Sequence, residues 1–227
     1  MASGKFEEIP LEVHQQVLKT NLFGYMHGAY NAIKVFKKQN EGILINNISI
    51  GGFMPAPYSA VYSASKYGIR GMMEGLQGEI SNRRDIHICN LYPQLQNSTG
   101  NLHSAKYSGF DMKIPFIASD PCDTAAAMVN LAQHPKKDTF PDFQSAAITN
   151  TYRLFPKLII NSASAAVRMK MKFNVDKENN PGNVLTNSKE PLRVHGKLPS
   201  KTSSKLSLAL FAALGFGVAV LVMGKKS

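Results

Sequence analysis

The chain has 227 residues, of which 44% are hydrophobic, 18% charged and 9% aromatic, so it is not collagenous, low-complexity or wholly disordered. Its net charge of +11 is unevenly placed: residues 1–150 carry 13 Lys and Arg against 12 Asp and Glu, whereas residues 151–227 carry 13 against three. Two cysteines are too few for a disulfide scaffold. We therefore predict one near-neutral globular domain over residues 1–150, followed by a basic tail.

Apolar periodicity along residues 1–150 predicts helices that alternate with strands. In chain order we expect a long helix over 7–38, a strand over 42–49, a helix over 60–80, a strand over 86–92, a helix over 121–133 and a short strand over 146–149. This alternation is typical of right-handed crossovers on a parallel sheet, which places the chain in the α/β class. Loops as long as residues 94–119 usually carry function or are mobile.

The basic tail has three predicted parts. Residues 151–172 indicate a basic helix with five cations and no acid, and residues 173–204 have the polar composition of a flexible linker. Leu206–Met223 is apolar throughout and, as a helix, would be roughly 27 Å long, enough for the hydrocarbon core of a bilayer. We predict a C-terminal transmembrane anchor over residues 205–227, the alternative being a buried core helix or an amphipathic helix on a partner.

The charges around the apolar stretch predict its orientation. The heavier basic block precedes it, which favours a domain that faces the cytoplasm, and the N-terminus lacks the pattern of a signal peptide. The basic segment adjoins the apolar stretch and lacks interleaved aromatic residues, so we expect it to meet anionic lipid head groups and expect no nucleic-acid partner.

Tyr62 and Lys66 carry the clearest chemical signal. In the sequence YSASK they lie one helical turn apart on the same face. A nearby ammonium favours a phenolate, so we expect Lys66 to lower the pKa of Tyr62 toward the range that alcohol–carbonyl interconversion needs. The spacing alone is weak evidence, because Tyr30 and Lys34 repeat it, and we interpret that second pair as a surface pair.

Two polar residues before Tyr62 distinguish the first pair. Ser49 ends the predicted strand 13 residues earlier, and sites in open parallel sheets form at the carboxyl ends of strands. Its hydroxyl is therefore placed to hold a substrate carbonyl beside Tyr62. Asn21, 28 residues before Ser49, is a candidate to hold a water against Lys66 and relay the proton.

The order and spacing of Asn21 in TNLFG, Ser49 in INNISIGG, Tyr62 and Lys66 in YSASK, and Pro93 after the next strand resemble the short-chain dehydrogenase/reductase family. The resemblance covers roughly residues 5–150 and implies a partial Rossmann-like fold. It implies that Tyr62 exchanges the proton, Lys66 also binds the nicotinamide ribose, Ser49 orients the substrate and Asn21 supports the relay. It further implies NAD or NADP as cofactor and a homodimer through the helices 7–38 and 60–80.

The sequence departs from this family in the cofactor-binding half. The Gly-rich turn that holds the cofactor pyrophosphate does not occur in these residues. After Pro93 the family has a Thr that meets the carboxamide, and here Ser98 is the residue available for that contact. We therefore expect either a membrane-tethered oxidoreductase for a small, apolar alcohol or carbonyl, or a catalytically inactive remnant that acts through binding.

The sequence contains no comparable pattern for a metal site or a hydrolase triad. The six histidines show no metal-ligand spacing, so no metal site is predicted. No Gly-x-Ser-x-Gly elbow surrounds a serine, which argues against a hydrolase triad.

Overall fold

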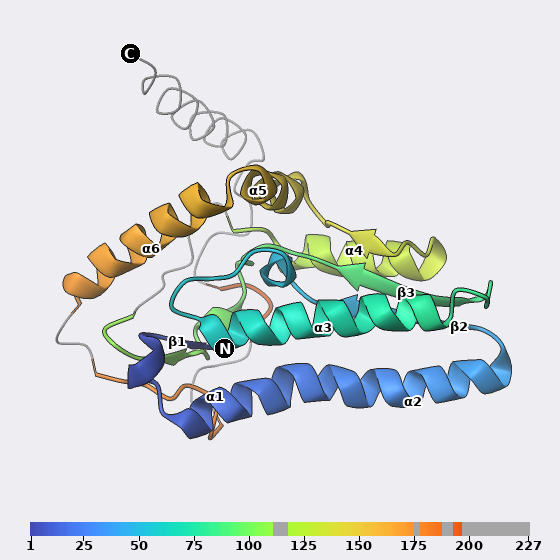
Figure 1. The fold of residues 1–227 in the computed structure, drawn as a ribbon, viewed down its shortest axis with the longest axis horizontal. Helices are drawn as coiled ribbons and strands as arrows, with labels where there is room; N and C mark the ends of the chain where they lie inside the picture. The colour runs from blue at the N-terminus through green and yellow to red at the C-terminus, as the bar shows by residue number, and fades with distance from the viewer. Residues whose placement is uncertain (111–117, 175–177, 188–192, 197–227) are drawn as a thin grey trace, which may run out of the picture.

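The computed structural model describes residues 1–110, 118–174, 178–187 and 193–196. At its centre lies a parallel sheet of three strands in the order β2–β3–β5, formed by Gly42–Asn47, Ile86–Leu91 and Asp138–Thr139 (Figure 1). Asn47 pairs with Leu91, so the carboxyl ends of β2 and β3 lie at the same edge. The predicted α/β class with a parallel sheet is confirmed.

The predicted helix over 7–38 begins later than expected and contains a local irregularity. A separate 3₁₀ turn covers Phe6–Glu8, and the main helix begins after Pro10, whose backbone is extended. It runs as α1 (Leu11–Leu18), a π-helical turn (Lys19–Phe23) and α2 (Gly24–Gln39). Asn40, in the left-handed conformation with φ 61°, ends it, as is common at helix C-termini.

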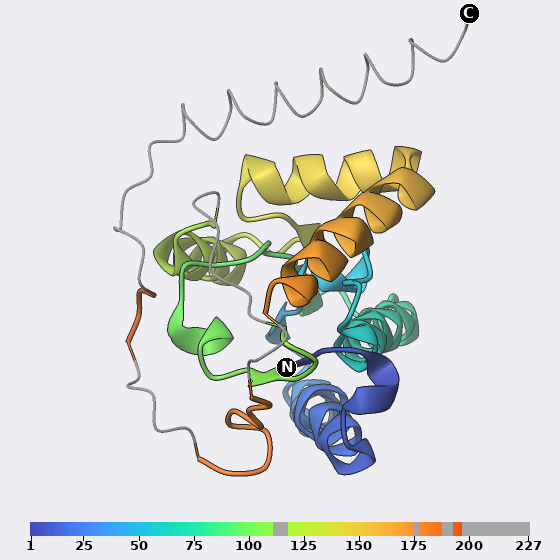
Figure 2. The same cartoon turned by 90° about the vertical axis from the view of Figure 1, so that its left-hand side faces the viewer.

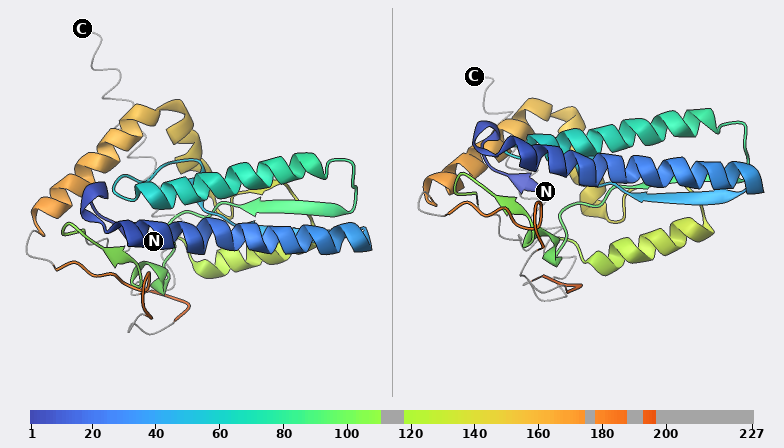
Figure 3. Two further views of the ribbon diagram at one scale, coloured as in Figure 1. Left: turned by 60° about the horizontal axis from the view of Figure 1, so that its bottom comes forward. Right: turned by 90° about the horizontal axis from the view of Figure 1, so that it is seen from below.

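Helices cover both faces of the sheet. Figure 3 shows α2 and α3 (Ala60–Glu79) on one face and α4 (Pro121–Gln133) on the other. Side chains of β3 alternate between them: Ile86 and Ile88 join the core beneath α2 and α3, whereas Cys89 and Leu91 pack with α4. This two-sided burial explains why four of the six residues of β3 are apolar.

A small second sheet lies beside the start of α3. β1 (Ala2–Ser3) pairs in parallel with β4 (Ala105–Lys106). On the other side of β4, Lys106 forms an isolated antiparallel bridge with Asn180. Figure 2 shows these segments around the N-terminus, below the end of α6. The loop after β3 is thereby tied to both ends of the described chain.

The strand predicted over 146–149 is wrong, because these residues belong to α5 (Phe143–Leu154). Asp142 caps this helix: its carboxylate accepts a hydrogen bond from the backbone N–H of Ser145 at 2.6 Å. The strand lies earlier, at β5, where Asn90 N–H donates to the Lys137 carbonyl at 2.8 Å and Tyr92 N–H to that of Thr139 at 2.9 Å. The N-cap aspartate Asp142 was the signal that the apolar pattern concealed.

Within the segment predicted as a basic helix, α5 ends at Leu154, and α6 (Pro156–Lys172) follows with Pro156 in its first turn. The predicted anchor over 205–227 lies outside the described residues. Among the helices that the structure does describe, none is long and apolar enough to cross a membrane. The domain boundaries at 150, 172 and 204 stay predictions.

The Asp142 cap yields a test of the fold. Its carboxylate also accepts a hydrogen bond from the Ser119 hydroxyl at 2.8 Å, so it joins α5 to the loop before α4. We expect Asp142→Ala to lower the free energy of unfolding by about 1–2 kcal/mol, measured by urea denaturation. Glu41→Ala, at an exposed position, is the control. An unchanged midpoint for Asp142→Ala would contradict the assigned cap.

Candidate active site

Ser49 lies in a strained turn directly after β2. Its φ is 125°, in the region that favours glycine, and its hydroxyl accepts a hydrogen bond from the backbone N–H of Gly51 at 3.1 Å. A side chain at Gly51 would place Cβ 3.3 Å from Cε1 of Tyr62 and 3.5 Å from Oγ of Ser49. The glycine therefore allows the turn to approach the phenol closely.

Tyr62 and Lys66 project from the first turns of α3 toward this turn. Tyr62 is hydrogen-bonded through its side chain to Ser49. The Lys66 side chain is buried, and its Nζ lies 5.7 Å from the centre of the Tyr62 ring. The structure thus brings together the three residues that the sequence placed at one site.

Burial dominates the electrostatics of both groups. It raises the pKa of Tyr62 above its usual value, an effect that the hydrogen bond with Ser49 opposes in part. It lowers the pKa of Lys66 to about 8. The expected net lowering of the Tyr62 pKa is therefore wrong for this arrangement, because Nζ lies over the ring face and desolvation outweighs the other contributions.

Asn21 lies in the π-helical turn and reaches α3 through a different partner from the one expected. Its amide donates to the hydroxyl of Ser65 at 3.0 Å, and that hydroxyl donates to the carbonyl of Tyr62 at 2.6 Å. Asn21 is thus linked to the residue before Lys66 rather than to Lys66 itself. Its role in a proton relay stays a prediction.

Pro93 joins the site more closely than Ser98. The Pro93 carbonyl accepts a hydrogen bond from Ile50 N–H at 3.0 Å, so the loops after β2 and β3 are in contact. Ser98 lies further along, at the N-terminus of a short 3₁₀ turn formed by Thr99–Asn101. Its predicted contact with a cofactor stays a prediction.

Tyr25 is a site residue that the sequence analysis missed. Its ring centre lies 5.5 Å from Nζ of Lys66, so the ammonium lies near two aromatic rings. Its hydroxyl donates to the carbonyl of Asn47 at the end of β2. Burial, and then the proximity of Tyr62, raise the pKa of Tyr25. The available signal was its position four residues after Asn21, on the same helix face.

The other Tyr-x-x-x-Lys pair behaves as the sequence analysis interpreted it. Tyr30 and Lys34 lie on the exposed side of α2, where Nζ of Lys34 is 3.5 Å from the Tyr30 hydroxyl and 4.8 Å from the ring centre. Identical spacing therefore gives a solvated pair on one helix and a buried site on another. The two pairs differ because Tyr62 faces Ser49 in the turn after β2, whereas Tyr30 is exposed.

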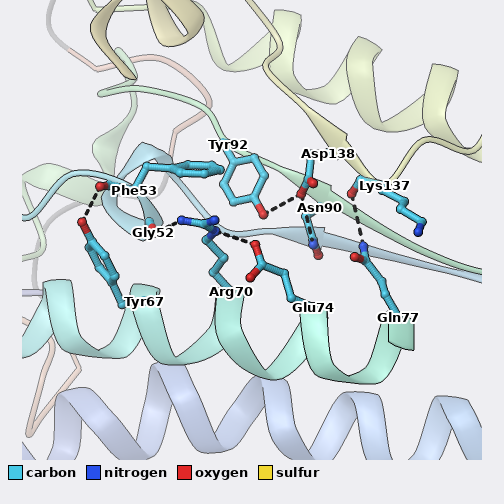
Figure 4. Close-up of polar contacts among 10 residues, drawn as sticks. All are labelled: Gly52, Phe53, Tyr67, Arg70, Glu74, Gln77, Asn90, Tyr92, Lys137 and Asp138. Carbon is cyan, nitrogen blue, oxygen red and sulfur yellow. Dashed lines mark hydrogen bonds and ion pairs between the residues drawn. The ribbon is translucent and has the colours of Figure 1, made fainter. Parts of the chain in front are cut away.

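A network of polar contacts fixes α3 against the sheet and the turn after β2 (Figure 4). The Tyr67 hydroxyl donates to the Phe53 carbonyl, and Arg70 donates to the Gly52 carbonyl at 3.4 Å. Further along, Gln77 donates to the Ile88 carbonyl at 2.9 Å. The Arg70 guanidinium also lies 3.8 Å from the centre of the Phe53 ring. These contacts hold the helix that carries Tyr62 and Lys66 in register with Ser49.

One histidine has metal-ligating neighbours. Asp120 Oδ1 lies 3.1 Å from Nε2 of His195, which is 3.9 Å from Sγ of Cys122. The same carboxylate oxygen caps α4 by accepting the Cys122 N–H at 2.9 Å. We interpret the cluster as a helix cap with a hydrogen bond between Asp120 and His195 at the surface.

Comparisons with known proteins agree with this geometry. Residues 1–106 match the family model described as short chain dehydrogenase. An uncharacterized oxidoreductase of Bacillus subtilis is 25% identical over 68% of this chain and 44% of the relative. A 3-ketodihydrosphingosine reductase of Bacteroides thetaiotaomicron is 37% identical over 36% of this chain and 30% of the relative. The chain spans about half the length of the curated relatives it matches.

Solved structures show the same fold. A short-chain dehydrogenase from Sphingobium yanoikuyae in complex with NADPH has a TM-score of 0.57 at 19% identity, covering 70% of this chain and 61% of that one. A short chain dehydrogenase from Burkholderia cenocepacia J2315 in complex with NADP has a TM-score of 0.55 at 18% identity, covering 71% and 63%.

The lowered pKa of Lys66 predicts a pH-dependent stability. Between the folded value of about 8 and the usual value of 10.5, the unfolded chain binds more protons, so stability rises with pH. From about pH 7 to about pH 9 this gain is about 1 kcal/mol. We expect Lys66→Met to remove it, as measured by urea denaturation at both pH values. The control is Lys34→Met, which should retain the wild-type difference, and a wild-type difference retained by Lys66→Met would contradict the burial of this ammonium.

Proposed function

Because the chain is a member of the short-chain dehydrogenase/reductase family, we propose that it interconverts an alcohol and a carbonyl with NAD(P)(H). The observation that carries the proposal is the meeting of Ser49, Tyr62 and Lys66 at the carboxyl edge of the parallel sheet. A surface pair of the same spacing lacks the first of these residues, so the constellation is more specific than the Tyr–Lys motif alone.

In this proposal Tyr62 exchanges the proton. Its raised pKa keeps the phenol protonated at neutral pH, which suits a donor to the carbonyl oxygen during reduction. The Ser49 hydroxyl, already hydrogen-bonded to Tyr62, would hold that oxygen within reach. The Lys66 ammonium would stabilise the phenolate that remains after the transfer. Asn21 would act as a positioning residue through Ser65.

The nicotinamide cofactor supplies or accepts the hydride when it is bound. The residues at this edge fit its nicotinamide end: Lys66 is buried against two rings and makes no hydrogen bond within the described residues, so its donors are available to ribose hydroxyls. With Tyr62, Pro93 and Ser98 it forms the cofactor contacts that we propose. NADPH- and NADP-bound structures with this fold support a nicotinamide cofactor, either NAD or NADP.

A second candidate function is binding without catalysis. Two observations favour it: the 227 residues include no Gly-rich turn for a pyrophosphate, and β2 has a free edge within the described part of the chain. A free edge accepts a further strand, from this protein or from a partner. Turnover by the purified protein would exclude this candidate.

We also propose that the oxidoreductase is tethered to a membrane with its domain in the cytoplasm. The basic residues before the apolar stretch Leu206–Met223 support this orientation, and an anchor makes an apolar substrate reasonable. A homodimer through α2 and α3 is a further proposal. It is supported by exposed apolar and aromatic side chains on these helices, namely Met26, Val35 and Tyr67.

Tyr62→Phe tests the catalytic proposal. We expect the variant to retain its fold and to lose at least about 100-fold in turnover, because the phenol oxygen that carries the proton is removed. Nicotinamide absorbance would be followed with NADH and NADPH against a panel of apolar aldehydes and ketones. Tyr30→Phe, in the matched surface pair, should turn over like wild type. Equal rates for Tyr62→Phe and wild type would contradict the assigned role.

Protease accessibility tests the orientation. In intact vesicles that carry the full chain, protease added outside should cut the domain if it faces the cytoplasmic side. The measurement is the fragment pattern with and without detergent. A domain that stays uncut until detergent is added would show the opposite orientation.

A further inference from the structure

Helix α6 lies at the periphery of the molecule and uses only one face for packing (Figures 1 and 2). Met171 is its one buried residue, and Ile159, Ile160 and Val167 are half-buried. At 100° per residue these four side chains point to the same side of the helix. The opposite side is therefore free of contact with the described core.

That free side carries four exposed apolar side chains together with exposed Ser162. Leu158, Ala165, Met169 and Phe173 are all exposed, at helical spacings of seven, four and four residues. Met169 is 62% exposed and Phe173, which caps the helix, 81%. We call these four residues the outer stripe. An exposed apolar stripe of this kind, interrupted at Ser162, marks an interaction surface.

Cations flank the outer stripe along one side. By the same rotation of 100° per residue, Lys157, Arg168 and Lys172 lie along this flank, whereas Lys170 lies at the angle of the packing residues, between Ile159 and Val167. All four are exposed, and α6 contains no acidic residue. Lys157 and Lys172 are placed to bury their stems beside the stripe while their charges reach phosphate groups, and Arg168 donates a hydrogen bond to the Ser164 hydroxyl at 2.8 Å.

We propose that the outer stripe of α6 docks onto the surface of an anionic membrane, parallel to the bilayer plane. The apolar side chains enter the boundary between head groups and acyl chains, and the flanking cations meet anionic lipid head groups. The domain would then be held to the same bilayer at two points, by α6 and by the predicted anchor.

The position of the apolar C-terminal stretch supports lipid as the occupant. The inference rests on the proposed membrane tether. From Gly196, the last described residue, to Leu206 the chain has ten residues, which extend to at most about 35 Å. An anchored chain therefore keeps the domain, with α6 on its surface, close to the head groups. A nucleic acid would instead require aromatic residues among the cations, and a second copy of α6 would bring like charges together.

The absence of tryptophan from the sequence allows a direct test. Met169→Trp introduces a sole tryptophan on the outer stripe of the full chain, and Phe173→Trp provides a second reporter on it. Val129→Trp on α4 is the matched control, because Val129 and Met169 are both 62% exposed. Each variant is reconstituted with phosphatidylcholine vesicles, with and without phosphatidylserine. Tryptophan emission, quenching by brominated lipids and vesicle flotation are then measured.

We expect both outer-stripe reporters to shift to the blue and to be quenched in phosphatidylserine vesicles, while the α4 reporter stays unquenched. Adding Lys157→Gln and Lys172→Gln, both from the cationic flank, should weaken docking by roughly 25-fold, about fivefold per cation. If the protein floats but the outer-stripe reporters match the α4 control, the proposed docking of α6 is wrong, whereas the proposed membrane tether is retained. If the protein does not float with the vesicles, the proposed tether and the proposed docking of α6 are both wrong.

Two further outcomes would replace lipid with another occupant. A blue shift that grows with protein concentration in the absence of vesicles would assign the outer stripe to a second copy of the chain. A shift produced by RNA and abolished by salt, without quenching by brominated lipids, would assign the face to nucleic acid. Either result overturns the proposal.

Discussion

The docking of α3 onto the turn after β2 is the constraint on which the site depends. Ser49 takes up a strained backbone conformation at the strand end, and Gly51 lets the turn approach the ring of Tyr62. Tyr67 and Arg70 then tie the same turn to α3 through the carbonyls of Phe53 and Gly52. The hydroxyl, phenol and ammonium are thus fixed by contacts on both sides rather than by the helix alone.

The burial that orders these groups also sets their protonation. It favours the neutral form of each, raising the pKa of Tyr62 and lowering that of Lys66. A neutral phenol suits proton donation. The buried Lys66 ammonium, by contrast, keeps its charge more readily when a polar partner accepts its hydrogen bonds in place of water. Ribose hydroxyls would provide such a partner. The site is accordingly arranged for a ligand that completes its hydrogen bonds.

Much of this arrangement was readable from the sequence, because the governing signals are local. The strands over 42–49 and 86–92 and the helices over 60–80 and 121–133 follow from apolar runs, caps and glycines, and each matches an element of the structure within two residues. The order of Ser49, Tyr62 and Lys66 placed them at one strand end. The predicted strand over 146–149 failed because helix and strand compete for a short apolar segment, and the Asp142 cap decided for α5.

The remaining features depend on contacts between distant residues. The spacing from Asn21 indicates only the helix face of Tyr25, and no spacing rule predicts that Asn21 meets Ser65 or that burial raises the Tyr62 pKa. The outer stripe of α6 was likewise hidden, since the sequence shows apolar residues on both sides of that helix and only packing identifies the free one. Tertiary contacts, not local propensity, decide these points.

The central claim is that this edge of the sheet takes the nicotinamide end of a cofactor. The most direct measurement is isothermal titration calorimetry of NADPH and NADH against the purified full chain and its Lys66→Met variant. The account predicts saturable binding of one nucleotide by wild type and clearly weaker binding by the variant. No binding of either nucleotide by wild type would contradict it and leave the constellation as a structural inheritance.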